Sequence, residues 1–300
     1  MSKNKINKKV KRSYQDMIFD LCNNAIMSII VIIMLYPMWH VLIASVSDSN
    51  YLAAHRGILL APLNFTLEAY RLVMKNPNIL SGYVNTIFVV VVGTIGSTFI
   101  TAIGAYALAR KNYPFKRIVT FFIIFTMYFG GGIIPRYLLL ANGMNMRNNI
   151  WVLIIPHLVT TYNLIVMRTG FEGIPDSLEE SARIDGASDF RILFQIIIPV
   201  ALPTVAVIVL FYAVSYWNSW FDATIFINDR NKYPLQVVMR EILIANSTES
   251  MTAGEAGDRV AIGESIKYAA IMISTLPILF VYPFVQKYFV KGMTVGAVKG

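Results

Sequence analysis

Six apolar runs, each close to the length of a membrane-spanning helix, constrain this chain more than any other feature. A helix needs about 20 mainly apolar residues to cross a hydrocarbon core about 30 Å thick. Almost none of the runs carries an internal charge. They cover residues 18–44, 84–109, 118–134, 150–167, 200–221 and 266–286. The sequence therefore predicts an all-α fold, a polytopic membrane helix bundle of about six transmembrane helices.

The composition indicates the same class of protein. Hydrophobic residues make up 56% of the 300 residues and charged residues only 14%, which is too apolar for an ordinary soluble domain. The first run is longer than the apolar part of a cleavable signal peptide, so we interpret it as a retained span. We expect a basic cytoplasmic tail over residues 1–17 and a single transmembrane domain over residues 18–300, with no appended soluble domain.

Lysine and arginine predict the orientation, because cytoplasmic loops of membrane proteins accumulate them. With the N-terminus inside, the inner segments hold 16 Lys/Arg in 71 residues and the outer segments hold 10 in 100. We therefore expect both termini on the cytoplasmic side of a bacterial inner membrane. The long outer loops are then 43–83 and 223–267, and the long inner loop is 168–199. The net charge of +9 gathers in the tail beside the first span, which favours contact with anionic lipid over nucleic acid.

Small residues recur every four positions in the second run and form one narrow helix face. They are Gly93, Ser97, Thr101, Ala105 and Ala109. Another backbone can approach such a face closely. The face could pack within this chain or against a partner subunit, and the sequence leaves both open.

The third run is interrupted by Gly130, Gly131, Gly132 and Pro135. Helical backbone is not expected to continue through these residues. The irregular segment could line a wet cavity at membrane depth, or it could be an ordinary helix exit at the surface.

Few polar side chains lie inside the runs. We interpret His157, in the fourth run, as a neutral histidine that is hydrogen-bonded to a neighbouring helix. Asp20, near a membrane edge, is the one carboxylate inside a run, so no proton relay is expected. Cys22 is the only cysteine, which argues against an intramolecular disulfide and a cysteine-rich metal site.

The inner loop 168–199 is polar but carries the signals of a short helix. It holds six of the 17 acidic residues of the chain. Ser177 and Glu180 match a capping box, which predicts a helix that begins at about Leu178. Gly186 can take the left-handed conformation that ends a helix at little steric cost.

A second helix is expected to follow this turn and to enter the membrane. Ser188 or Asp189 can cap it, and its side chains become apolar up to Pro199. The first, two-turn helix is too short to be stable alone in water, so something must pack on it. Leu178 and Ala182 supply a small apolar strip. The pair could lie on its own bundle as a helical hairpin, or it could dock a cytoplasmic partner.

These loop residues resemble the EAA loop, E-A-A-x-x-x-G-x(9)-I-x-L-P, of permeases from binding-protein-dependent ABC importers. The matching residues are Glu180, Ser181, Ala182, Gly186, Ile196, Ile198 and Pro199. Ser181 replaces an alanine of the motif and Ile198 replaces its leucine. The likeness extends over nearly the whole chain after residue 15, including "YFGGGIIPRYLLL" and "QKYFVKGMTVGAVKG". It is strongest to the smaller six-span permease of maltose-type importers, in the subgroup that serves complex oligosaccharides and polysaccharide fragments.

The resemblance implies a type I ABC importer permease fold and a role as the transmembrane subunit of an ATP-driven oligosaccharide importer. The implied partners are a second permease in a heterodimer, two cytoplasmic ATPase subunits and an extracellular or periplasmic solute-binding protein. This chain contains no Gly-Lys pair and so lacks the G-x-x-x-x-G-K-[ST] phosphate loop. ATP and Mg are therefore expected on the partner ATPases, with no cofactor and no catalytic residue on this chain. The alternative is a stand-alone secondary transporter or channel for a small polar solute.

In such permeases the short helix, here at about 178–186, fits into a cleft of the ATPase and moves with it. The expected coupling residues are Glu180, Ser181, Ala182, Arg183, Asp185, Gly186, Ala187 and Arg191. Arg183 and Arg191 are expected to form ion pairs. The C-terminal segment 290–300 resembles a tail that reaches the ATPase interface.

An aromatic and polar cluster near the outer end of the fifth run has the chemistry to contact sugar. Its members are Tyr212, Tyr216, Trp217, Asn218, Trp220 and Asp222. Sugar rings stack on aromatic faces and sugar hydroxyls take hydrogen bonds. Tryptophan and tyrosine also gather at membrane interfaces without any ligand. In maltose-type importers the partner permease is expected to supply most of the sugar contacts.

Overall fold

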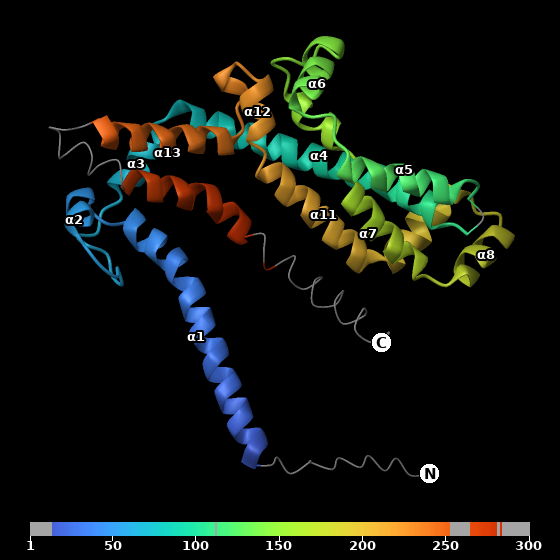
Figure 1. Cartoon of the computed structure of the whole chain (residues 1–300), viewed down its shortest axis with the longest axis horizontal. Helices are drawn as coiled ribbons and strands as arrows, with labels where there is room; N and C mark the ends of the chain where they lie inside the picture. Colours follow the sequence, from blue (N-terminus) through green and yellow to red (C-terminus); the bar gives the residue numbers. More distant parts are fainter. Residues whose placement is uncertain (1–13, 112, 253–264, 281–282, 284–300) are drawn as a thin grey trace.

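The computed structural model describes residues 14–111, 113–252, 265–280 and 283. Within them the backbone is almost entirely helical, and the β pairing is confined to one bridge between Ser47 and Phe65. Figure 1 shows α4 along the length of the body with α11 and α7 beside it, and α1 at an angle to them. Inner and outer refer to the orientation that the lysine and arginine distribution predicts. Most of the basic tail and the C-terminal segment 290–300 lie outside the described residues.

The membrane-spanning elements account for the apolar runs. Among the described residues, three helices are long and apolar enough to cross a membrane: α1 (Tyr14–Ser45), α4 (Pro77–Ala109) and the stretch Leu202–Phe226, which contains α11 (Leu202–Trp217). Two bent pairs raise the number to as many as five. The sixth run forms a shorter apolar helix, Ser265–Phe280, and most of its remainder lies outside the described residues. The all-α membrane bundle is confirmed.

The two bent pairs are the third and fourth runs. In the third, α5 (Lys116–Tyr128) is followed after a 107° bend by Ile133–Gly143, which consists of α6 (Ile133–Leu138) and η1 (Leu139–Gly143). In the fourth, η2 (Ile150–Leu153) and η3 (Ile155–His157) precede α7 (Thr161–Glu172), at 45° to it. Neither predicted span is therefore one straight helix.

The glycine break in the third run lies in open space. Gly130, Gly131 and Gly132 are exposed, and a Cβ built on any of them would meet no atom within 4 Å. Gly132 has a φ of +81°, which favours glycine. The prediction of an interrupted helix is confirmed.

Both predicted outer loops contain short helices. They are α2 (Ser49–Ala54) and α3 (Glu68–Met74) in the first, and α12 (Phe221–Phe226), η5 (Arg230–Lys232) and α13 (Leu235–Thr252) in and beside the second. Asp48 caps α2, because its carboxylate accepts from the backbone N–H of Asn50 at 2.9 Å.

The small-residue face of α4 packs against α11 of the same chain. A Cβ on Gly93 would lie 2.7 Å from the ring of Tyr216, so only glycine lets this ring approach. Ser97 shares a 2.8 Å hydrogen bond with the Tyr216 hydroxyl, and Thr101 shares one of 2.7 Å with the Tyr212 hydroxyl. Of the two arrangements that the sequence left open, packing within the chain is the one observed.

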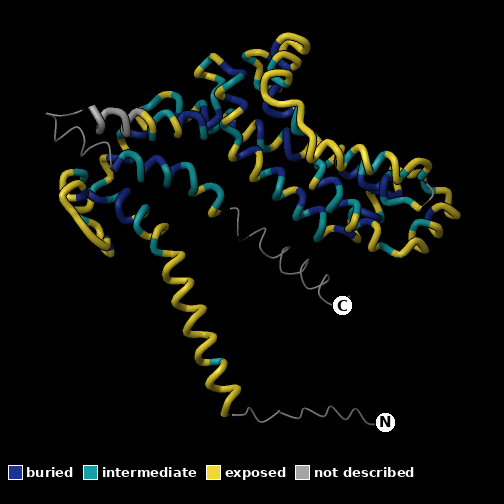
Figure 2. Tube along the Cα trace, viewed as in Figure 1, coloured by how far each residue is buried: buried dark blue, intermediate teal, exposed yellow. Residues whose placement is uncertain are grey.

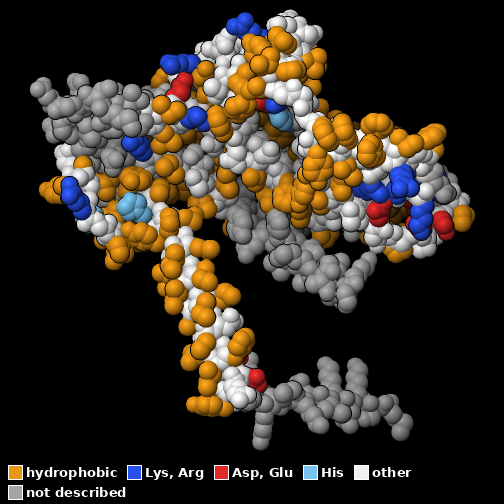
Figure 3. Space-filling view, in the orientation of Figure 1, with side chains coloured by type: hydrophobic (Ala, Val, Ile, Leu, Met, Phe, Trp, Pro, Cys, Tyr) orange, Lys and Arg blue, Asp and Glu red, His pale blue; other side chains and the backbone are white. Residues whose placement is uncertain are grey.

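Helix α1 makes few contacts with the rest of the chain. Only 6% of its most apolar 18-residue window is buried, and Figure 2 shows its length as exposed. Hydrophobic side chains cover it in Figure 3, whereas charged side chains gather over the α8 end of the molecule. Lipid or another protein chain must therefore cover most of α1.

Candidate functional site

The long inner loop folds into the predicted pair of short helices, but the first begins earlier than predicted. Helix α8 covers Asp176–Ile184, and its N-cap is Pro175, with no side-chain capping bond. The prediction of a capping box on Ser177 is therefore wrong. The extended ψ of Pro175 already suits an N-cap, and the carboxylate of Asp176 is held by the ammonium of Lys111. The backbone conformation of Pro175 and the ion pair of Asp176 both favour a start of α8 two residues earlier than predicted.

The end of α8 is the one that the glycine predicts. Gly186 has a φ of +79°, the N–H of Ala187 donates to Ala182 O at 3.0 Å, and the N–H of Gly186 donates to Arg183 O at 3.0 Å. These two bonds form the Schellman motif that satisfies the last carbonyls of a helix. Gly186 and Ala187 therefore turn the chain tightly toward the next helix.

The second helix also begins as predicted and leads into the membrane. Ser188 is the N-cap of α9 (Asp189–Ile192), and its hydroxyl accepts from the N–H of Arg191 at 3.4 Å. The helical path continues through a π-turn, η4 (Leu193–Ile197), and the short α10 (Ile198–Val200) into α11. The sequence did not predict the π-turn. The inner loop 168–199 is thus joined to α11 by continuous helical structure.

Helix α8 has one face against the bundle and one face in solvent. Of the two residues predicted to form a small apolar strip, Ala182 is only 7% exposed and lies in the hydrophobic core of the chain, whereas Leu178 is 41% exposed. The exposed face carries Ser177, Glu180, Ser181 and Ile184, at the i, i+3, i+4, i+7 spacing of one helix face. Ile184 is 87% exposed. This isoleucine lies outside the apolar runs, so lipid is not expected to cover it.

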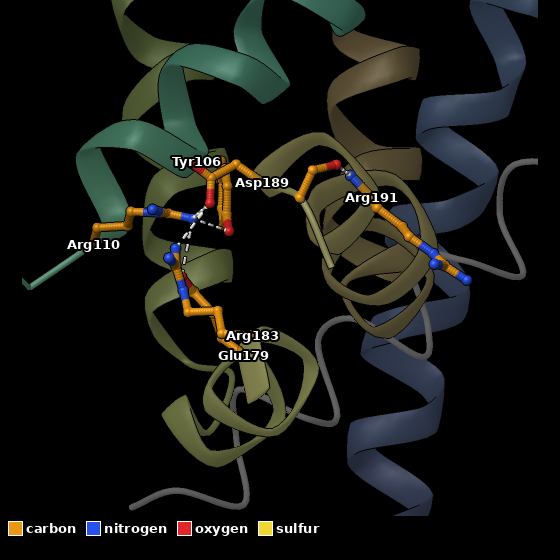
Figure 4. A network of polar contacts seen from close by, with 7 residues as sticks. Tyr106, Arg110, Glu179, Arg183, Asp189 and Arg191 are labelled. Atoms are coloured by element: carbon orange, nitrogen blue, oxygen red, sulfur yellow. Dashed lines mark hydrogen bonds and ion pairs between the residues drawn. The ribbon is translucent and has the colours of Figure 1, made fainter. Parts of the chain in front are cut away.

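Arg110, just beyond the inner end of α4, fastens the other face of α8. Its Nη2 lies 3.0 Å from Glu179 Oε1 and 2.8 Å from Asp189 Oδ1, and it also donates to the hydroxyl of Tyr106 (Figure 4). The guanidinium stacks over the Tyr106 ring at 4.4 Å. One arginine thus joins three helices. Arg110 was not predicted as a site residue; its signal is its place as the first charge after the second apolar run.

Arg183 completes this network from within α8. Its Nη2 lies 2.9 Å from both Glu179 Oε1 and Asp189 Oδ1. The hydrogen bond with Glu179 raises the pKa of Arg183, and the hydrogen bond from Arg110 lowers the pKa of the Asp189 carboxyl. The predicted ion pairing of Arg183 is confirmed within the chain, whereas Arg191 donates to Gln195 Oε1 at 2.9 Å instead. Asp185 is exposed.

A cavity of about 620 Å³ lies between α8 and the segment that joins α4 to α5. Four cationic and four acidic side chains line it. Lys116, for example, lies 2.9 Å from Glu172, and a hydrogen bond with Asp176 raises the pKa of Lys111. Because the charges balance, the cavity does not favour an anion such as a nucleotide phosphate. It separates α8 from the bundle on one side.

The predicted outer cluster divides into buried and accessible members. Tyr212 and Tyr216 are 1% and 3% exposed, and their hydroxyls are bonded to α4. Trp217 lies in a second hydrophobic core, with Leu235 among its neighbours. Asn218 is exposed. A guanidinium, that of Arg240, stacks over Trp220 at 3.8 Å.

Asp222, the last member of that cluster, is brought to two residues that the sequence did not connect with it. Its Oδ2 lies 2.6 Å from Arg136 Nη2 and 2.6 Å from His157 Nε2. The prediction that His157 bonds to a neighbouring element is confirmed. The sequence did not predict that a carboxylate meets His157; Asp222 follows the fifth apolar run and folds back onto the bundle. The described residues hold no group of three or more metal-ligating side chains.

Comparisons with known proteins show the family of this chain. Residues 101–295 match the family model of the "Binding-protein-dependent transport system inner membrane component". The polygalacturonan/rhamnogalacturonan transport system permease protein YtcP of Bacillus subtilis (strain 168) is 38% identical over 94% of this chain and 99% of its own length. Protein LplC of the same organism is also 38% identical, over 94% of this chain and 95% of its own length.

A solved structure is similar over nearly the whole fold. It belongs to a bacterial ABC transporter involved in the import of the acidic polysaccharide alginate, and one of its chains superposes with a TM-score of 0.81 at 33% identity. The similarity covers 93% of this chain and 99% of that chain.

Proposed function

This chain belongs to the family of inner membrane components of binding-protein-dependent transport systems, and we propose that it couples sugar import to a partner ATPase through α8. It is a permease of the oligosaccharide and polysaccharide ABC importers. As a transport component it forms part of a membrane pathway. ATP hydrolysis, with its Mg, we assign to separate ATPase subunits.

The proposed substrates are oligosaccharides derived from polysaccharides. The names of similar proteins include transporters of polygalacturonan or rhamnogalacturonan and of alginate. Within this chain, Asn218 and Trp220 remain the accessible members of the cluster that we propose for the sugar pathway. The hydroxyls of Tyr212 and Tyr216 are engaged by α4, so we propose that these two support the pathway by packing.

The proposed partners are a second permease, two ATPase subunits and a solute-binding protein outside the membrane. The nearly bare surface of α1 supports a partner within the membrane, because an apolar helix of 32 residues with so few contacts in its own chain offers a large surface to another one. The positive charge of the inner segments supports the orientation with both termini in the cytoplasm.

The exposed side chain of Ile184 is the observation that carries the proposed coupling role. It projects from a helix that is fixed at both ends, by Lys111 at Asp176 and by the turn at Gly186. A helix held in this way can transmit a displacement, because its other face is joined to α4 by Arg110. We propose that closure of the ATPases moves α8 and, with it, the bundle. Glu180, Ser181 and Asp185 surround Ile184 as the polar rim of this contact.

Co-purification tests this proposal directly. The tagged chain, extracted in mild detergent, is expected to bring down the ATPase and the second permease. Ile184→Asp should lose the ATPase and keep the second permease, because a buried unpaired carboxylate is costly in an interface. Ile184→Leu is the matched control and should retain both. Equal recovery of the ATPase with Ile184→Asp would overturn the coupling role of this face.

A further inference from the structure

Three separate segments converge on one carboxylate oxygen at the outer side of the permease. Asp222, in α12, places Oδ2 2.6 Å from Arg136 in α6 and 2.6 Å from His157 in η3. Nη2 of Arg136 also lies 3.1 Å from Nε2 of His157, so the three side chains form one compact cluster. Asp222 belongs to the cluster proposed for the sugar pathway, but the coupling mechanism proposed above uses none of the three.

Each of these segments is connected to its span through a break in the helix. Residues of α6 follow the 107° bend after α5, and η3 precedes the 45° bend into α7. Three residues, 218–220, separate α12 from α11. A continuous helix would fix the direction of each outer segment relative to its span, whereas a broken helix leaves that direction free. Side-chain contacts must therefore determine how these three ends sit together.

The burial of the three side chains is unequal. The Asp222 side chain is 6% exposed, whereas those of Arg136 and His157 are 38% and 40% exposed. A buried carboxylate is costly without partners, so Asp222 needs both donors for as long as it stays buried. The two donors face solvent on one side and can leave without burying a charge. The contact of Asp222 with Arg136 and His157 is thus stable while Asp222 is buried. It can break only if α12 moves away from α6 and η3.

We propose that Asp222 is a positioning residue that holds the outer side of the permease closed through Arg136 and His157, and that this contact breaks when the outer side opens to receive sugar. We call the three side chains the outer latch. The proposal rests on the importer function above. It assigns the cluster no ligand, because the single oxygen that joins the segments already accepts from two donors.

Coupling between the two sides of the membrane gives the latch a measurable effect. In the proposed mechanism, closure of the ATPases is linked to opening of the outer side of the permease. Coupled equilibria are reciprocal, so a change that favours opening of the outer side also favours closure of the ATPases. Weakening the latch should therefore raise ATP hydrolysis in the absence of sugar and binding protein. A defect of folding alone would lower it.

The test uses the complete importer reconstituted in liposomes. Asp222→Asn should raise ATP turnover without binding protein by about fivefold or more, the lower range of couplings between distant sites. Asp229→Asn is the matched control, because Asp229 lies on the same side and, within the described residues, its carboxylate accepts only from the nearby N–H of Asn231. Unchanged turnover in an assembled Asp222→Asn importer would overturn the latch.

A second experiment decides the question if Asp222→Asn does not assemble. Cys22 is the only cysteine of this chain, so Cys22→Ser removes its thiols, and cysteines of the other subunits are replaced in the same way. In that background, Arg136→Cys with Asp222→Cys can be joined by a short, cleavable bifunctional thiol reagent. Joining should stop sugar uptake and cleavage of the reagent should restore it. Normal sugar uptake while the two cysteines are joined would contradict the latch. Failure of the importer without any substitution to take up sugar would contradict the importer function itself.

Discussion

The guanidinium of Arg110 lies 2.8 Å from the carboxylate of Asp189 and thereby joins the inner end of α4 to the first residue of α9. The same nitrogen lies 3.0 Å from Glu179 in α8. Helix α4 is in turn packed onto α11 through Gly93, Ser97 and Thr101. A displacement of α8 can therefore reach two spans, one through Arg110 and one through the helical path into α11.

Arg110→Gln should uncouple ATP hydrolysis from transport. Loss of the guanidinium frees α8 from α4, so we expect the sugar carried per ATP hydrolysed to fall by about fivefold or more. The two rates are measured together in liposomes. Arg117→Gln is the control, because Arg117 lies on the same side, in the first turn of α5, and its side chain is exposed. If Arg110→Gln left the sugar carried per ATP hydrolysed unchanged, α8 would act on the bundle without the contact to Arg110.

Gly186→Ala should weaken coupling while the importer still assembles. At a φ of +79° a side chain strains the backbone, at a cost of about 1–2 kcal/mol. The turn that ends α8 would then relax and Ile184 would lose its fixed direction. Gly186→Asn should be affected less, because asparagine tolerates this conformation. Uptake rates of the two variants provide the measurement, and equal rates for alanine, asparagine and glycine would contradict the prediction.

Gly93→Ala should destabilise the bundle. The new Cβ would lie 2.7 Å from the ring of Tyr216, and overpacking of this kind costs about 1–3 kcal/mol. The midpoint of thermal unfolding in detergent gives the measurement. Gly130→Ala is the control, because a Cβ there meets nothing within 4 Å. An unchanged unfolding midpoint for Gly93→Ala would show that α4 and α11 are not tightly packed at Gly93.

The stabilising effect of Asp189 should persist at neutral pH and disappear only in acid. Arg110 lowers the pKa of this carboxyl, so its contribution is present above the unfolded pKa, about 4, and is lost as the pH falls through the lower folded pKa. The difference in unfolding midpoint between the protein and Asp189→Asn should be constant from pH 8 to about pH 5. It should shrink below about pH 4. A difference that vanishes already at pH 6 would contradict the assignment.

Local signals predicted the inner loop well because the contacts that shape it are local. Gly186 ends α8 and Ser188 caps α9 through bonds that span only a few residues. The start of α8 was missed because the competing partner of Asp176 is Lys111, from another segment. The apolar runs predicted the spans, but not the bends, because a count of apolar residues carries no information about helix direction.

The two ionic clusters could not be predicted, since they join residues far apart in the chain. Arg110 and Asp189 are 79 residues apart, and Asp222 is 86 residues from Arg136 and 65 from His157. Nothing local to Arg136 or Asp222 distinguishes them from solvated outer charges. The small-residue face illustrates the same limit, because its spacing predicted a close neighbour but could not identify α11.

The isolation of α1 has a consequence for biogenesis. A span that contacts its own chain at one end alone has its tilt set by whatever lies beside it in the bilayer, because a helix in lipid takes its tilt from neighbours. The fold of this chain is therefore completed only on assembly. In a cell that makes the permease without its partner subunits, α1 would stay unconstrained, and membrane quality control could recognise the unassembled subunit by this helix.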